Sequence, residues 1–258
     1  MIPKIIHMCW FGPHDIKKNQ IIQKCIASWH TYMGDYTIME WTESNIDIGS
    51  LPAFAQNAYK NKKWAYVADV VRFQKLYEYG GIYLDTDMLI LKDMSPLLEK
   101  DYKNNSDKST SCNDTSIWGY EDDTHISCGI IAANKNNKLI KEISDFYINH
   151  YRNNNLNHII AVPKIVSDII NKNKIADAKF EKEIKIYSQE YFYPLPNTNK
   201  KEDYNKFITN NSYAVHLWNY SWQPWYMKAL SELGIVQIGK AILRGKIRIV
   251  IKKLLRLG

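Results

Sequence analysis

The chain has 258 residues, of which 45% are hydrophobic and 24% are charged. These proportions are typical of globular domains, so they exclude a wholly disordered chain, a collagen-like repeat and a disulfide scaffold. The sequence has no apolar run of roughly 18 residues, no secretory leader pattern and no Cys-x-x-Cys pair. We therefore expect no membrane span, no signal peptide and no structural zinc site, and the four cysteines fit a reducing compartment.

The net charge of +7 is unevenly distributed along the chain. Residues 235–258 hold seven of the 34 basic residues and no acidic residue, which leaves 27 basic and 27 acidic residues in 1–234. A neutral body argues against a nucleic-acid interface spread over the domain. The basic C-terminal segment instead indicates a local anionic partner.

The spacing of apolar residues predicts elements that alternate along the chain. Strands are expected at 4–10, 36–41, 82–85 (resuming at 88–91), 117–120, 128–133, 184–187 and 213–218. Helices are expected at 20–32, 64–79, 138–151, 163–172 and 223–233, and a long polar loop at 101–116. Gly80 and Gly81 stop the second helix, because glycine adopts the left-handed cap conformation without strain. The alternation predicts one α/β domain with a mostly parallel central sheet over 1–234, followed by a helix over 235–258.

Two carboxylates, Asp85 and Asp87, come directly after an apolar strand. Side chains two apart at a strand end emerge on the same side, and paired carboxylates repel one another unless a cation lies between them. A divalent ion held by one or two carboxylates keeps open positions for phosphate oxygens. The pair therefore indicates a metal–diphosphate site, and the alternative is an exposed Asp-x-Asp turn.

Asp69 and Arg72 share one face of the predicted helix of 64–79. Their neighbours in the sequence are mostly apolar, so we expect the charged pair to be partly buried and to need a partner or a function. The alternative is a surface ion pair of little energetic value.

The segment from Trp64 to Asp87 resembles the sugar-nucleotide-binding region of family 32 glycosyltransferases. That family includes bacterial capsule and lipopolysaccharide enzymes and yeast initiating mannosyltransferases, and it is related to the core of the clostridial glucosylating toxins. The agreeing positions are Ala65 or Ala68, Asp69, Arg72, Leu76, Tyr77, Gly80, Gly81, Tyr83, Asp85 and Asp87. Ala68 stands where the family usually has Ser. Residues 2–12 and 214–222 resemble the opening strand and the closing motif, whereas 101–210 match only loosely.

The resemblance implies a GT-A fold, a Rossmann-like sheet that binds a nucleotide sugar at the carboxyl ends of its strands, as open α/β sheets do. It implies that Asp87 binds a divalent metal, Mn²⁺ or Mg²⁺, and that Asp85 contacts the ribose or the metal. His216 is the candidate for a further metal ligand, with a core histidine as the alternative. The metal would neutralise the diphosphate leaving group.

The resemblance also implies roles in donor binding. Asp69 and Arg72 would hold the hydroxyl groups of the donor sugar, because a carboxylate beside a guanidinium offers acceptors and donors together. Trp10 would stack on the base, unless it is a core tryptophan, and Tyr83 would face the same site. Residues Ser221 and Trp222 would close over the phosphates. His7 is expected to be structural.

These implications predict a retaining enzyme that moves a hexose from a nucleotide sugar, a UDP-sugar by resemblance, to a glycan or lipid-linked saccharide in surface polysaccharide assembly. The alternatives are a toxin-like protein glycosyltransferase and a non-catalytic nucleotide-sugar or carbohydrate-binding module. The loop acids and histidine of 121–125 are candidates for the acceptor side, with a solvated turn as the alternative. They are Glu121, Asp122, Asp123 and His125.

The C-terminal segment 235–258 carries a basic stripe with helical spacing. Its members are Lys240, Arg244, Arg248, Lys252 and Arg256. A basic amphipathic helix is typical of a membrane-surface element, and cytoplasmic leaflets are anionic. We expect a cytoplasmic protein, peripheral at the inner face of the membrane, where a polyprenyl-diphosphate-linked acceptor would lie. The alternative is a terminal helix packed on the body.

Overall fold

The computed structural model describes residues 1–13, 15–99, 114–150, 160–176, 183–200 and 202–219. The chain divides into two units, Met1–Trp218 and Asn219–Gly258, and the elements below all belong to the first. The predicted helices at 223–233 and 235–258 lie outside the described residues, as does most of the predicted loop at 101–116. Within the described part, no helix is long and apolar enough to cross a bilayer.

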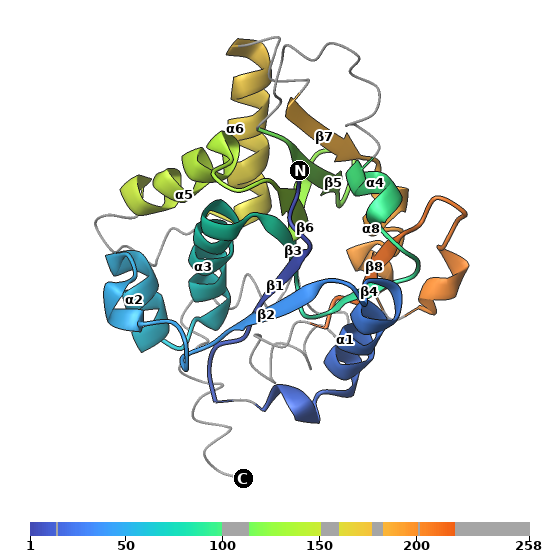
Figure 1. Ribbon diagram of the computed structural model, residues 1–258, viewed down its shortest axis with the longest axis horizontal. Coiled ribbons are helices and arrows are strands. Elements are labelled where there is room, and N and C mark those ends of the chain that lie inside the picture. Colours follow the sequence, from blue (N-terminus) through green and yellow to red (C-terminus); the bar gives the residue numbers. More distant parts are fainter. Residues whose placement is uncertain (14, 100–113, 151–159, 177–182, 201, 220–258) are drawn as a thin grey trace, which may run out of the picture. The chain divides into compact units, whose positions relative to one another are not determined.

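A six-stranded sheet with the order β2-β1-β3-β6-β5-β7 forms the centre of the first unit (Figure 1). Its strands are β1 (Ile5–Cys9), β2 (Thr37–Trp41), β3 (Gly81–Leu84), β5 (Ser116–Tyr120), β6 (Ile126–Ala133) and β7 (Ile184–Tyr187). Only β6 runs antiparallel to its neighbours β3 and β5, and the other described pairings in this sheet are parallel. This confirms the predicted α/β class with a mostly parallel central sheet.

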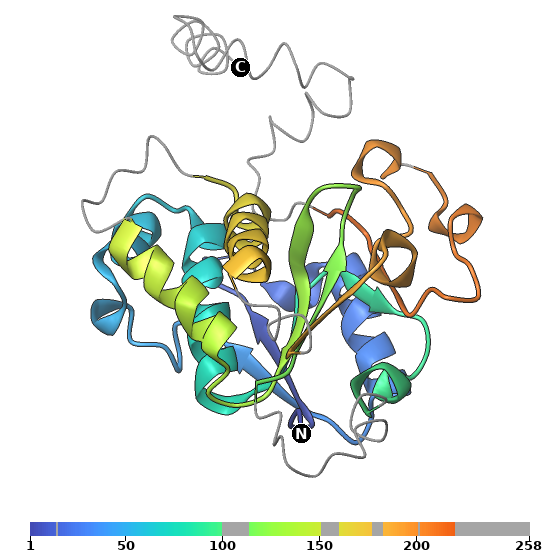
Figure 2. The same cartoon turned by 90° about the horizontal axis from the view of Figure 1, so that it is seen from above.

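Helices cover both faces of the sheet, so every residue of β3 and β6 is buried. The α-helices are α1 (Gln20–Tyr32), α2 (Ala53–Lys60), α3 (Trp64–Tyr79), α4 (Ser95–Glu99), α5 (Lys138–His150), α6 (Val162–Ala176) and α8 (Gln189–Phe192). Single 3-10 turns occur at Ile16–Lys18, Ile48–Ser50, Asn197–Asn199 and Tyr204–Lys206. Helices α2, α3, α5 and α6 lie on one face, and α1 and α8 lie on the other (Figure 2).

The turn between α3 and β3 fixes the start of the central strand. Gly80 and Gly81 have φ values of 66° and 110°, and Gly80 N donates to Leu76 O as the helix ends. A Cβ atom on Gly81 would lie 2.6 Å from Ile5 O on β1, so glycine is required for both reasons. His7 supports this turn as expected: its buried Nε2 lies 2.7 Å from Gly80 O, and its Nδ1 accepts from Trp41 Nε1.

A second, two-stranded sheet brings the C-terminal part of this unit next to the end of β3. It consists of β4 (Met88–Ile90) and β8 (Ala214–His216), paired antiparallel with Met88 opposite His216. The prediction that 88–91 resumes the preceding strand is therefore wrong. The chain turns between Asp85 and Met88, whose N–H donates to Asp85 O, and β4 finds its partner in β8 instead.

Candidate active site

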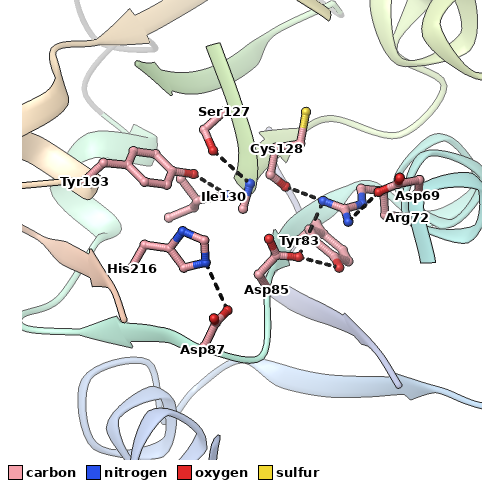
Figure 3. Close-up of polar contacts among 11 residues, drawn as sticks. Asp69, Arg72, Tyr83, Asp85, Asp87, Ser127, Cys128, Ile130, Tyr193 and His216 are labelled. Atoms are coloured by element: carbon pink, nitrogen blue, oxygen red, sulfur yellow. Dashed lines mark hydrogen bonds and ion pairs between the residues drawn. The ribbon is translucent and has the colours of Figure 1, made fainter. Parts of the chain in front are cut away.

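Three potential metal ligands lie close together near the C-terminal ends of β3 and β8. Asp85 follows β3, Asp87 precedes β4, and His216 ends β8. One ligand atom from each of the three lies within 4.8 Å of the other two, and His216 Nε2 lies 3.0 Å from Asp87 Oδ1 (Figure 3). Two carboxylates and one imidazole suit a divalent cation such as Mn²⁺ or Mg²⁺. The residues present therefore fit the predicted metal.

The electrostatics of His216 reflect the same neighbours. Burial lowers its pKa, but the carboxylates of Asp87, Asp85 and Glu121 together raise it, so the pKa of His216 lies above its usual value of 6.5. The carboxylates that favour a proton on the imidazole would also favour a bound cation. Binding of a metal ion would replace that proton.

Asp85 is anchored from the side of β3 and α3. Tyr83 OH donates to Asp85 Oδ1 over 2.9 Å, and Arg72 Nη1 lies 3.4 Å from the same oxygen. The Asp85 N–H donates to Gly129 O on β6 over 2.8 Å. These contacts hold the Asp85 backbone and its Oδ1 atom against the sheet. The side chain still has 28% of its surface exposed. Tyr83 itself is buried, and burial raises the pKa of its hydroxyl.

Asp69 and Arg72 form an ion pair that is more deeply buried than Asp85. The predicted burial of this pair is therefore confirmed. Arg72 Nη2 donates to Asp69 Oδ1 over 2.8 Å, Nη1 donates to Cys128 O over 2.7 Å, and the guanidinium lies 4.5 Å from the Tyr83 ring centroid. Burial raises the pKa of Asp69 to about 7, although Arg72 opposes the shift. The Arg72 Nε–H is buried and has no protein partner among the described residues.

Of the other residues predicted to bind the nucleotide sugar, only some lie in the described part of the structure. Trp10 directly follows β1 at the same edge of the sheet as Asp85, is partly exposed, and donates its backbone N–H to Trp41 O over 2.9 Å. The two residues predicted to close over the phosphates, Ser221 and Trp222, lie outside the described residues.

Two acidic residues in the turn between β5 and β6 have pKa values that are shifted in opposite directions. Asp122 is slightly buried, but hydrogen bonds from Thr124 and His125 dominate and lower its pKa to about 2. With its exposed ion pair to His125, this carboxylate belongs to a solvated turn. Glu121 is less exposed than Asp122, and burial raises its pKa.

Sequence reasoning missed Tyr193, which lies just after α8. Its side chain is fully buried, and its hydroxyl accepts a hydrogen bond from Ile130 N over 2.9 Å. Its ring centroid lies 5.9 Å from that of His216. The only signal in the sequence is an aromatic run, Tyr-Phe-Tyr, before Pro194, and that pattern is more typical of an ordinary core than of a site.

Two family models match successive parts of this chain. The first, described as a glycosyltransferase sugar-binding region containing a DXD motif, matches residues 20–104. The second, described as an alpha 1,4-glycosyltransferase conserved region, matches residues 132–239. The first segment contains Asp69, Arg72, Asp85 and Asp87, and the second contains His216.

Curated relatives are distant. Lactosylceramide 4-alpha-galactosyltransferase of Rattus norvegicus is 22% identical over 195 residues, which cover 71% of this chain and 49% of the relative. Inositol phosphoceramide mannosyltransferase 3 of Schizosaccharomyces pombe is 33% identical over 103 residues, 38% of this chain and 27% of the relative. The chain thus spans about half the length, or less, of these two relatives.

Solved structures of similar fold carry glycosyltransferase titles. The PaToxG glycosyltransferase is 18% identical with a TM-score of 0.49, covering 70% of this chain and 73% of that one. The galactosyltransferase LgtC, in complex with donor and acceptor sugar analogues, is 12% identical with a TM-score of 0.45, covering 89% and 94%.

Proposed function

We propose that this chain is a glycosyltransferase of the kind described by the two family models that match it, and that it is a metal-dependent, retaining hexosyltransferase. Its donor is a nucleotide sugar, a UDP-sugar in our proposal, and its acceptor is a glycan or a lipid-linked saccharide. The observation that carries the proposal is the cluster of Asp85, Asp87 and His216 beside the buried Asp69–Arg72 pair.

In this proposal, the role of each side chain follows from its position in the site. Asp87 and His216 hold a divalent cation together with Asp85, and the bound cation supplies charge neutralisation for the departing diphosphate. Asp69 and Arg72 lie next to Asp85 and bind hydroxyl groups of the sugar in this proposal. Trp10, at the end of β1, stacks on the base.

The proposal extends to the acceptor and to the place of action. Sugar transfer serves surface polysaccharide assembly on the cytoplasmic side of the membrane, with a polyprenyl-diphosphate-linked acceptor. The supporting observation is the excess of basic residues in 235–258, which would bind an anionic lipid surface. For Ser221 and Trp222, which lie outside the described residues, binding of the donor phosphates stays part of the proposal.

A hydrolysis panel tests the reaction. Slow release of nucleotide from each of several nucleotide sugars is measured with Mn²⁺ and with EDTA, for the wild type, Asp87→Asn and Asp168→Asn. Asp168, an exposed carboxylate on α6, is the matched control. We expect release from one donor that needs Mn²⁺, survives Asp168→Asn and falls by about 100-fold or more in Asp87→Asn. Binding of a nucleotide sugar without any turnover, even with saccharide acceptors added, would favour the binding module instead.

A further inference from the structure

We propose that Tyr193 and Trp218 are positioning residues that set the orientation of the His216 imidazole. The Trp218 ring centroid lies 4.0 Å from that of His216, with the ring planes at 47°. The Tyr193 ring meets His216 edge-on, at 5.9 Å and 83°. His216 thus packs against two aromatic rings of low exposure, whose own centroids lie 6.4 Å apart. Its Nε2 points to Asp87 (Figure 3). The inference rests on the proposed function only in taking the cluster to be a cation site.

The Tyr193 hydroxyl is tied to the strand that also holds Asp85. It accepts from Ile130 N over 2.9 Å, and the preceding residue, Gly129, accepts the Asp85 N–H over 2.8 Å. A Cβ atom on Gly129 would lie 3.1 Å from both Asp85 Oδ2 and Tyr193 Oη, so a glycine leaves the room that both groups use. One short stretch of β6 therefore fixes a carboxylate ligand and the support of the imidazole ligand at once.

Trp218 is anchored from the same segment of chain. Its Nε1 donates to Leu195 O over 2.9 Å, two residues beyond Tyr193. The backbone of Trp218 has a φ of 50°, a conformation that residues other than glycine rarely adopt. The strained residue follows Leu217, whose N–H donates to Asp87 O over 3.0 Å. Segment 193–195 thus anchors both of the rings that pack against the imidazole.

Binding of Mn²⁺ alone, followed by electron paramagnetic resonance, tests the inference. The variants are Tyr193→Phe, which removes only the hydroxyl group, and Trp218→Phe, which removes the Nε1 donor and keeps a ring. Tyr191→Phe is the matched control, because the Tyr191 ring packs against Tyr187 and stacks on Tyr213. His216→Ala reports the loss of the ligand itself. Thermal melting of each variant is recorded in parallel.

We expect Tyr193→Phe and Trp218→Phe to raise the Kd for Mn²⁺ by about 10-fold to 100-fold and to alter the spectrum of the bound ion, as changes outside the ligand set do. Tyr191→Phe should match the wild type. In donor cleavage, saturating Mn²⁺ should restore most of the lost rate. The inference is overturned if the two variants melt earlier but bind Mn²⁺ as the wild type does while His216→Ala does not. If the wild type itself binds no Mn²⁺, the proposed metal-dependent function fails first, and the inference fails with it.

Discussion

At the scale of single residues, the Asp69–Arg72 pair is the feature that stability alone does not explain. Both side chains are buried, and Arg72 is held by Asp69, by Cys128 O and by the ring of Tyr83. Moving two charges out of water costs free energy that their mutual attraction often fails to recover. A buried, pKa-shifted pair beside a cluster of potential metal ligands is typical of a functional site.

The raised pKa of Asp69 predicts a pH dependence of stability. Between pH 3.8 and about 7, the folded protein keeps a proton that the unfolded chain has released. The contribution of this group to the unfolding free energy is therefore full below 3.8 and is lost as pH rises through about 7, at no more than about 1.4 kcal/mol per pH unit.

Asp69→Asn should remove that contribution, because the amide does not titrate. Urea unfolding at pH 5, 6 and 7 measures the slope, with Asp168→Asn as a control for the loss of an exposed carboxylate. We expect the stability of Asp69→Asn relative to the wild type to increase with pH over this range. A constant difference across the range would contradict the raised pKa.

At the scale of elements, the site depends on where β3 begins. The turn at Gly80 and Gly81 lets α3 deliver Asp69 and Arg72 beside a strand that carries Tyr83 and ends at Asp85. Because side chains alternate along a strand, a shift of one residue would exchange the faces of Tyr83 and its neighbours. The turn therefore determines the site as well as the fold.

Gly81→Ala should be strongly destabilising, since the new Cβ would lie 2.6 Å from Ile5 O at a φ of 110°. We expect a loss of about 2–3 kcal/mol in unfolding free energy. Gly49→Ala is the control, because its Cβ would meet only the exposed side chain of Asp47, at 3.2 Å. Equal effects of the two substitutions on the chemical unfolding midpoint would contradict the role of the turn.

Sequence alone predicts the elements whose pattern is local. The helices at 20–32 and 64–79 and the strand at 184–187 have the predicted bounds, because apolar spacing or an apolar run marks them clearly. Helix α2 was not predicted, since Ala53–Lys60 is short and follows Pro52. The partner of β4 could not be predicted either, because an apolar run does not reveal which distant strand it pairs with.

The same distinction applies to the site. Asp69, Arg72, Asp85 and Asp87 fall within one short segment, so their pattern is legible in the sequence. The candidacy of His216 depended on resemblance. Tyr193 could not be found, because only folding brings α8, β6 and β8 together around it.

At the scale of the whole molecule, charge is divided between a neutral body and a basic C-terminal segment. Replacing the five residues of the basic stripe (Lys240, Arg244, Arg248, Lys252 and Arg256) by Gln should weaken binding to anionic phosphatidylglycerol vesicles by about fivefold per charge. Cosedimentation of the full-length proteins measures this, with phosphatidylcholine vesicles as the control. Equal sedimentation of wild type and variant would contradict the proposed membrane contact, and unchanged donor cleavage in the variant would show that the body is intact.

The central claim is that Asp85, Asp87 and His216 bind a divalent cation together with a nucleotide sugar. Isothermal titration of a panel of nucleotide sugars, with and without Mn²⁺, tests it most directly in the wild type and in Asp87→Asn. We predict binding of at least one nucleotide sugar that requires Mn²⁺ and is lost in Asp87→Asn. The claim would be contradicted if nucleotide-sugar binding were the same with and without Mn²⁺ and in Asp87→Asn. It would also be contradicted if no nucleotide sugar bound with Mn²⁺ present.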